Sequence, residues 1–453
     1  MRVLLLGMGS RGDVAPLVAL GERLVERGYA VSLAAPRDLG HVVEGSTVDF
    51  EPLSFDLEGP LREGLGRDAL RGSARTQVRE ARLMRQVMAG TATALAADVT
   101  RLVEQADAVV SGALTFDVVD ALLTPACGPG DSRSLVAPTL TKPTKPHVYV
   151  VFAPVWPSAH GASVALGLLP HRTSVLNRAW STLAGRVALD LFRPAGDLVR
   201  TRRELPRQRF GRYTAAAART PTLLAASPHV VPPAADWPTG LRQTGYWVRS
   251  RDEAPLPDRA CGSIPAPALD PALEAFLDAG PAPVYVGFGS MPTPDPDRLV
   301  RDLVGVLGRV GQRGVVSAGL AGLSVDAAVP DVIGTGPTPH DLLFPRCAVI
   351  VHHGGAGTTA AAVRAGVPQV VVPHAADQPY WGRRMADLGV AGPPVARKDL
   401  TPARLAAALD VALSQAARSA AYDLGVRVRA EDGAGDAARL VDEHLRVFAR
   451  MAG

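Results

Sequence analysis

The chain opens with short apolar runs that are separated by longer amphipathic stretches. Residues 2–6 predict a buried strand, residues 14–27 an amphipathic helix that Gly28 ends, and residues 30–34 a second strand. A strand, a helix and another strand in this order favour a parallel sheet with right-handed crossovers. The pattern therefore indicates an α/β protein.

The same alternation continues through the first half of the chain. Residues 70–105 are rich in helix-forming sequence, and strands are expected at 108–111, 148–153 and 223–226. Residues 124–146 interrupt the pattern, since they are rich in proline, glycine, serine and threonine. This composition predicts a long loop.

The second half of the chain repeats the plan after a proline-dense stretch. Long strands and helices cannot run through the many prolines of residues 228–283, so a linker between domains is expected there. The α/β pattern restarts at residues 283–290, and a helical tail is expected at 437–451. A chain of 453 residues suits two domains. We expect a first α/β domain, a linker, a second α/β domain and a C-terminal helix, at residues 1–245, 246–268, 269–435 and 436–453.

Composition and charge narrow the range of functions and locations that this protein can have. The net charge of +4 is small for this length, and no run of lysine or arginine is long enough to suggest a nucleic-acid-binding tail. Three widely spaced cysteines suggest neither a zinc site nor a redox pair, and fit a reducing cytoplasm. No apolar run approaches the roughly 20 residues of a membrane-spanning helix. We expect a cytoplasmic protein without a transmembrane segment.

The most informative segment is residues 351–359, in which an apolar run leads into His-His-Gly-Gly-Ala-Gly-Thr-Thr. The order is strand, glycine turn and helix start. A helix start offers unpaired N–H groups and a positive dipole end, and glycines let a phosphate approach the backbone. Asp377 and Gln378 follow the next predicted strand, so they should open onto the same crevice. A carboxylate beside a carboxamide suits sugar hydroxyls.

A glycine-rich turn alone is common in parallel α/β proteins, but here several motifs occur in order. The segment 337–389 resembles the nucleotide-sugar signature of inverting glycosyltransferases, most closely the bacterial enzymes that glycosylate antibiotics and the sterol glucosyltransferases. The matching pieces are Pro339–Pro345, the histidine–glycine loop, the Gly-Val-Pro turn at 366–368 and Asp377–Gly382.

This resemblance implies an α/β fold of the GT-B type. Two Rossmann-like domains would face each other across a cleft, and the C-terminal helix would cross back to the first domain. The co-substrate would be a UDP- or dTDP-hexose, with no metal and no other cofactor. The acceptor would be a small lipophilic aglycone, such as a polyketide, a macrolide or a sterol.

The resemblance also places a general base at Asp13, because this chain carries Gly9-Ser10-Arg11-Gly12-Asp13 where the antibiotic and sterol enzymes have an aspartate. From the residues alone, the alternative is that Asp13 is the N-cap of the helix that follows, and both roles are possible at once. A free carboxylate has a pKa near 4 and is a weak base. Partial burial would raise that pKa and suit general-base work.

Other positions match the parts of the family's nucleotide-sugar site. Among the two histidines, His353 is the candidate diphosphate contact, and His352 is expected to support the turn. Adjacent residues at a strand end point apart, which disfavours a metal site. Sugar contacts are assigned to Asp377 and Gln378. Diphosphate contacts are also assigned to Ser10, Ser290, Gly355, Ala356, Gly357 and Thr358, and nucleoside contacts to Gly336, Thr338 and His340.

Several alternatives stay open at this point. Many relatives hold the ribose with a glutamate where this chain has Ala361, so the choice between UDP and dTDP is not predicted. Gly7, Gly9 and Gly12 also match a short dinucleotide fingerprint, with Arg37 suited to a 2′-phosphate. An NADPH-dependent oxidoreductase, an epimerase and a catalytically silent partner of another transferase are therefore further hypotheses. The oligomeric state is not predicted.

Overall fold

The structure is a computed structural model. It describes residues 1–57, 59, 74–125, 143–160, 164, 174–249, 268–289, 295–319, 322–326, 329–374 and 376–452. Most of the predicted loop at 124–146, most of the linker at 246–268 and the candidate Ser290 lie outside these ranges.

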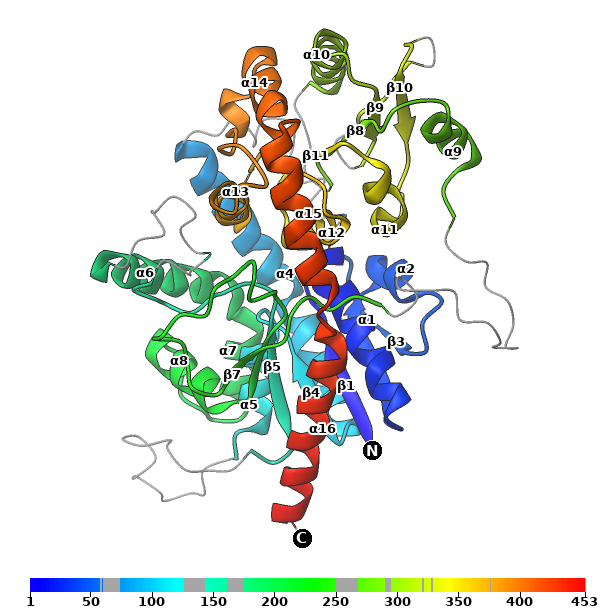
Figure 1. Cartoon of the computed structure of the whole chain (residues 1–453). Helices are drawn as coiled ribbons and strands as arrows, with labels where there is room; N and C mark the ends of the chain where they lie inside the picture. The colour runs from blue at the N-terminus through cyan, green and yellow to red at the C-terminus, as the bar shows by residue number, and fades with distance from the viewer. Residues whose placement is uncertain are drawn as a thin grey trace.

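Seven parallel strands form the first sheet, in the order β3-β2-β1-β4-β5-β6-β7 (Figure 1). From β1 the chain first builds outward to β3 and then crosses to β4 on the other side, so the strand order reverses between β1 and β4. In open parallel sheets, ligands bind beyond the carboxyl ends of the strands at such a reversal. The strands are β1 (Arg2–Leu6), β2 (Ala30–Pro36), β3 (Asp49–Leu53), β4 (Ala108–Ser111), β5 (His147–Val151), β6 (Thr222–Leu224) and β7 (Leu241–Gln243).

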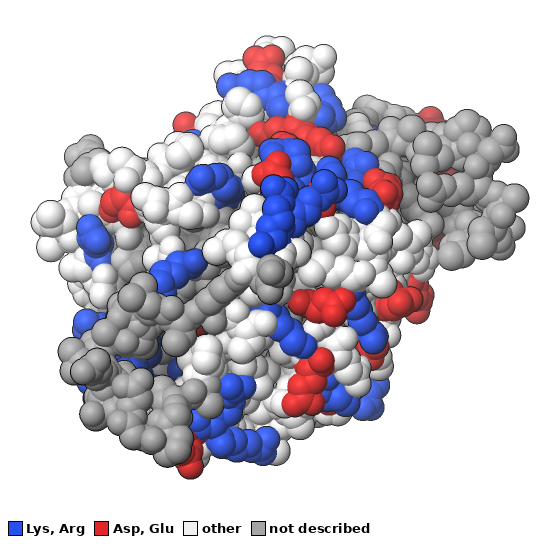
Figure 2. All heavy atoms as spheres, turned by 90° about the horizontal axis from the view of Figure 1, so that it is seen from below, with Lys and Arg blue, Asp and Glu red and all other residues white. Residues whose placement is uncertain are grey.

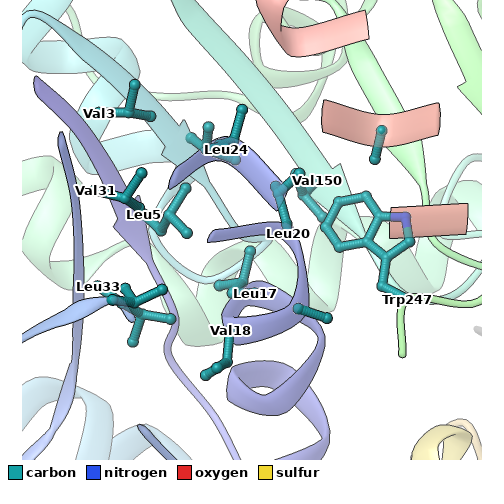
Figure 3. Close-up of a cluster of buried hydrophobic side chains, with 14 of the residues drawn as sticks. Val3, Leu5, Leu17, Val18, Leu20, Leu24, Val31, Leu33, Val150 and Trp247 are labelled. Carbon is teal, nitrogen blue, oxygen red and sulfur yellow. The ribbon is translucent and has the colours of Figure 1, made fainter. Parts of the chain in front are cut away.

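Helices cover both faces of this sheet. In one core the helix after β1 places Leu17, Leu20 and Leu24 over the strands, while Trp247 closes the cluster beside Val150 (Figure 3). This apolar packing holds the carboxyl end of β1 in a fixed position. The helices are α1 (Arg11–Glu26), α2 (Gly40–Val43), α4 (Ala74–Gln105), α5 (Phe116–Leu123), α6 (Val175–Phe192), α7 (Pro194–Arg202) and α8 (Phe210–Arg219), with a short 3-10 turn η1 (Arg37–Leu39).

The second sheet has five parallel strands in the order β10-β9-β8-β11-β12. Its strand order reverses between β8 and β11, so the histidine–glycine loop after β11 lies at the reversal. The strands are β8 (Val284–Gly287), β9 (Gly314–Ser317), β10 (Val332–Thr335), β11 (Val349–His352) and β12 (Gln369–Val371). The accompanying helices are α9 (Pro271–Asp278), α10 (Pro296–Arg309), α11 (His340–Leu343), α12 (Ala356–Ala365), α13 (Gln378–Asp387), α14 (Pro402–Ala412) and α15 (Gln415–Arg429), with 3-10 turns η5 (Phe344–Arg346) and η6 (Arg397–Asp399).

The final helix, α16 (Gly433–Ala452), runs along the first domain (red in Figure 1). Its Ala437, Val441 and Leu445 belong to the core around α1, and the Tyr29 hydroxyl donates to Asp442 at 2.5 Å. A second apolar cluster joins both halves, because Tyr149 and Leu224 share it with Tyr380 and Trp381. The two sheets are therefore held together by side-chain packing as well as by the returning helix.

One sequence expectation differs from the structure. The first helix begins at Arg11 rather than at residue 14, because Ser10 caps it. The described part of the proline-dense stretch 228–283 agrees with the expectation that no long element runs through it, since it holds the short strand β7 and the eight-residue α9. Pro271 occupies the first turn of α9, where a missing N–H costs nothing, and Asp270 caps that helix.

The surface carries both signs of charge. On the face seen from below, basic and acidic side chains are interspersed (Figure 2). Within the described ranges, no helix combines the length and the apolar character that crossing a bilayer would require.

Candidate active site

The turn after β1 holds the Asp13 carboxylate rigidly. Its Oδ2 accepts the Ser10 backbone N–H at 2.7 Å and the Ser10 hydroxyl at 3.2 Å, while the Ser10 Oγ accepts the Gly12 N–H at 3.2 Å. This reciprocal arrangement is a capping box. The N-cap interpretation of Asp13 is therefore wrong: Ser10 is the N-cap. Among the described residues Asp13 Oδ1 has no hydrogen-bond donor, so one oxygen is fixed and the other is available.

Burial changes the basicity of this carboxylate. Removal from water raises the pKa of Asp13 to about 6, against the two hydrogen bonds from Ser10, and the charge of Asp377 adds to the rise. A carboxylate with this pKa is still ionised near neutral pH and is a stronger base than an exposed one. Asp377 lies in the second domain, so the two carboxylates come close enough to interact across the domain junction.

Asp13 can occupy its position only because residue 9 has no side chain. The φ of Gly9 is +137°, and a Cβ there would lie 2.2 Å from Asp13 Oδ2. On the expectation that Asp13 is a general base, Gly9→Ala should lower the turnover at least tenfold, because the carboxylate must move. Gly28→Ala is the matched control, since Gly28 also has a positive φ, of +87°, but a Cβ there meets nothing within 4 Å. That control should lose about 1 kcal/mol of stability and keep its turnover; equal turnover in both variants would contradict this role of Gly9.

The histidine–glycine loop forms an uncapped helix start. Gly355 is the N-cap of α12, and no side chain caps the first turn, which contains Ala356, Gly357 and Thr358. Gly357 is exposed, and a Cβ built there would lie 3.7 Å from the Gly12 Cα of the first domain. The first turn of α12 and the first turn of α1, which carries Asp13, therefore lie beside each other. An uncapped helix start with a positive dipole end can bind an anion.

The two histidines before this helix have separate environments. Their ring centroids are 6.4 Å apart and the rings are nearly perpendicular. His352 is fully buried: its Nδ1 accepts the Gly354 N–H at 3.1 Å, and its Nε2 lies 2.8 Å from the Gln369 Oε1. The proton must therefore be on Nε2, and burial lowers the pKa of His352 to about 3. His352 shapes the turn of the loop from inside the protein.

His353 points to the other side, over the glycine turn after β8. A Cβ on Gly289 would lie 3.0 Å from the His353 Cε1. Burial lowers the pKa of His353 to about 4, so the ring is neutral at pH 7 and supplies no positive charge in the ligand-free protein. Its Nδ1 is buried and has no hydrogen-bond partner within the described part of the chain. A buried polar atom without a partner is rare, and it can bond to a ligand.

The buried histidine gives a stability prediction. We expect His352→Ala to lower the free energy of unfolding by about 2–5 kcal/mol, because Gly354 N–H and the Gln369 carboxamide lose their partner and a cavity opens. Denaturant unfolding measures this. His352→Asn is the control, since its side-chain oxygen can replace the Nδ1 acceptor and should recover part of the loss. If both variants had the same free energy of unfolding as the wild type, this role of His352 would be contradicted.

The predicted sugar-binding pair splits into two environments. Asp377 precedes α13, and its Oδ2 accepts the Trp381 indole N–H at 2.7 Å, which orients the carboxylate. Gln378 is buried, and its Oε1 accepts the His374 N–H at 2.7 Å. Trp381 is fully buried, so it is not a stacking platform. Asp377 therefore faces the junction, whereas Gln378 shapes the turn before α13.

The predicted nucleoside segment lies between β10 and α11. The Thr338 hydroxyl donates to Gly336 O at 3.0 Å and lies 2.9 Å from the Thr335 hydroxyl, so it stabilises its own loop. His340 stacks on Phe344 with ring centroids 4.2 Å apart. Burial lowers the pKa of His340 to about 4, and the charge of Arg11 contributes. His340 is thus a neutral ring held against a fully buried phenylalanine.

Two residues near the site were not assigned from the sequence. Arg11 is exposed at the start of α1, and its charge helps to lower the pKa of His340 in the second domain. The signal was its position inside the Gly9–Asp13 motif. His374 ends the loop after β12, and burial, with the charge of Arg397, lowers its pKa to about 3. Its position after Pro373 gave no sequence signal of its own.

Comparisons with known proteins decide the family. Residues 3–110 match the N-terminal domain of glycosyltransferase family 28, and residues 301–438 match the C-terminal domain of the erythromycin biosynthesis protein CIII-like family. Vancomycin aglycone glucosyltransferase of Amycolatopsis orientalis is 33% identical over 461 residues, which cover 97% of each chain. The chain therefore belongs to the family of glycosyltransferases that includes this vancomycin aglycone glucosyltransferase. The prediction made from the histidine–glycine loop and its neighbouring motifs is confirmed at this level.

More distant relatives and solved structures agree with the fold. A sterol 3-beta-glucosyltransferase of Arabidopsis thaliana is 28% identical over 98% of this chain, which spans 66% of that longer protein. The calicheamicin glycosyltransferase CalG4 superposes with a TM-score of 0.63 at 16% identity, with 98% of both chains covered. The expected fold class, two parallel-sheet domains of the GT-B type with a C-terminal helix, is confirmed.

Proposed function

We propose that this glycosyltransferase moves a hexose from a UDP- or dTDP-sugar to a hydroxyl of a lipophilic natural product, with inversion and without a metal ion. The observation that carries the proposal is the meeting of three groups at the domain junction. The uncapped start of α12 and Asp377 come from the second domain, and Asp13, with one unpaired oxygen, comes from the first. They supply an anion site, a sugar contact and a base.

The proposed reaction is one displacement. The free oxygen of Asp13 takes the proton of the acceptor hydroxyl, and the acceptor oxygen attacks the anomeric carbon. The bond from that carbon to the diphosphate oxygen breaks on the opposite face, and the leaving diphosphate takes the bonding electrons. His353 and the N–H groups of Ala356, Gly357 and Thr358 stabilise the charge that grows there. The two domains contribute mainly by holding both substrates in line.

The choice of substrates rests on the relatives. By its name, one acts on the vancomycin aglycone, and an O-mycaminosyltylonolide 6-deoxyallosyltransferase of Streptomyces fradiae is 32% identical over 98% of this chain. A spinosyn rhamnosyltransferase of the same fold was solved with thymidine diphosphate. The names of these relatives favour a natural-product aglycone as the acceptor. Because one of the solved structures contains thymidine diphosphate, dTDP-sugars must be tested as donors along with UDP-sugars. A sterol acceptor with UDP-glucose is the second candidate, because the plant relatives are sterol glucosyltransferases.

A ligand panel tests the proposal. The protein is mixed with UDP- and dTDP-linked hexoses, and its melting temperature is recorded, since a ligand that binds the folded state raises it by mass action. The sugar nucleotide that binds is then offered with macrolide, aromatic and sterol acceptors, and the anomeric configuration of the product is determined by NMR. An inverted linkage is expected. No binding to any member of the panel, or a retained configuration, would refute the proposal.

Metal independence is a separate prediction. In the described ranges, no three His, Cys, Asp or Glu side chains are grouped so that they could hold a metal ion. In the proposed reaction, backbone N–H groups and His353 stabilise the negative charge of the leaving diphosphate in place of a metal ion. We expect EDTA to leave the transfer rate unchanged within twofold. Loss of activity with EDTA that Mg²⁺ restores would contradict this assignment.

A further inference from the structure

One flank of the first domain exposes an apolar helix face that no described element covers. Helix α6 packs on α4, α7 and α8 and lies at the left edge of the molecule in Figure 1. Its exposed apolar side chains are spaced by three or four residues, so they form one stripe along the helix. We call this the α6 stripe, and its members are Leu176, Trp180, Leu183 and Val187.

Beside the stripe, the same helix forms one wall of a basic hollow. The hollow has a volume of about 560 Å³. Arg186 on α6 and Arg193, the C-cap of that helix, line one side, and Arg209 and Arg212 line it from the start of α8. Arg193 is paired with Asp190 and Asp197. Within the described part of the chain, the other three arginines have no ion-pair partner. Their charges therefore remain available to an anion.

Gln208 also borders the hollow, but its carboxamide is fully buried and faces the interior. Its side chain is directed at Asp117, where its hydrogen bond opposes the rise in the pKa of that carboxyl. The donors that the hollow offers to an anion with several acceptor oxygens are therefore the arginine forks.

We propose that the α6 stripe and the basic hollow dock the protein on the surface of an anionic phospholipid bilayer. An apolar stripe with a tryptophan, bordered by arginines, is the pattern of a helix that lies in the membrane interface. The hollow accepts a lipid phosphate, and the stripe enters the acyl boundary beside it. A lipophilic acceptor dissolves in the bilayer, so docking would bring the first domain to the acceptor. The binding itself needs no sugar transfer, so it stands apart from the proposed function.

Vesicle sedimentation tests the docking. The full chain is mixed with vesicles of phosphatidylcholine alone, or of phosphatidylcholine with 30% phosphatidylglycerol, without any substrate. The wild type should bind the anionic vesicles and bind the neutral ones at least about tenfold more weakly. Each arginine near an anionic surface contributes about fivefold in affinity, so Arg186→Glu and Arg209→Glu should each lose that or more. Leu183→Glu should lose about tenfold, because a leucine no longer leaves water.

Matched controls separate the surface from general effects. Leu183 is 49% exposed and Val447 on α16 is 50% exposed, so Val447→Glu makes the same change elsewhere. Arg418→Glu repeats the charge reversal at an exposed arginine of α15. Both controls should bind vesicles as the wild type does, and all variants should keep the melting temperature shift with the sugar nucleotide, which shows that they are folded.

Four results would overturn the docking. These are no binding by the wild type, equal binding to both vesicle types, full binding by Leu183→Glu and Arg209→Glu, or equal loss in the controls. If Leu183→Glu instead dissociates a dimer in light scattering, the stripe binds a second copy and the membrane assignment is wrong. A raised KM for the acceptor in Leu183→Glu, without vesicle binding by the wild type, would make the stripe an acceptor wall.

Discussion

Asp13→Asn is expected to lower the rate of glycosyl transfer about 100- to 10,000-fold, which is the usual contribution of a positioned general base. An asparagine has nearly the same shape, and its side-chain oxygen can still accept the Ser10 N–H, so the start of α1 should stay intact. Transfer is measured by product formation under saturating sugar nucleotide. The melting temperature and its rise with the sugar nucleotide should match those of the wild type. Full turnover in Asp13→Asn would remove this residue from the mechanism.

The pH profile of the wild type provides the matching control. Asp13 must be ionised to act as a base, and burial holds its pKa at about 6. The value of kcat/KM should therefore fall tenfold per pH unit below about pH 6 and be constant above it. An exposed carboxylate would give this limb near pH 4 instead. A limb near pH 4, or one that persists in the residual activity of Asp13→Asn, would contradict the assignment.

His353→Ala is expected to lower kcat about 100- to 1,000-fold, the usual loss when one hydrogen-bond donor to a developing charge is removed. The physical reason is that the unpaired Nδ1 of His353 would donate to the diphosphate as it leaves. Its neighbour gives a contrast within one dipeptide. Replacing the buried His352 should lower the stability of the fold. Replacing His353 should lower the rate and leave the free energy of unfolding within about 1 kcal/mol of the wild type.

Two further variants identify the nitrogen involved. In His353→Asn, the side-chain NH₂ takes nearly the position of Nδ1, while in His353→Gln it takes nearly that of Nε2. If Nδ1 is the donor, the asparagine variant should keep at least tenfold more activity than the alanine and glutamine variants. Equal activity in all three would assign the contact to the α12 backbone alone. Wild-type activity in all three would exclude His353 from the site.

These predictions describe a site in which stability and function oppose each other. Burial that raises the pKa of Asp13 also disfavours its ionised form, so the folded protein gains no stability from that charge near neutral pH. The unpaired Nδ1 of His353 and the uncapped first turn of α12 have the same character. Such unsatisfied groups are tolerated where a ligand completes them.

The sequence by itself determined the local elements and the chemistry they carry. Apolar runs and helical periodicity located β1, α1, β4, β11 and α16 within a few residues, because the packing period of an element is a local property. The histidine–glycine loop, the Gly9–Asp13 motif and the Asp377–Gln378 pair named the family for the same reason. They are consecutive residues with a specific order.

Only the tertiary structure decided which of these groups meet and in what state. Residues 13 and 377 lie far apart in the chain, and their interaction depends on how the two domains pack through Tyr149, Leu224, Tyr380 and Trp381. The assignment of Ser10 as the cap, the neutral state of His353 and the burial of Gln378 depend on partners and on water exclusion. A linear pattern does not contain these, because desolvation and hydrogen bonding arise from neighbours brought together in space.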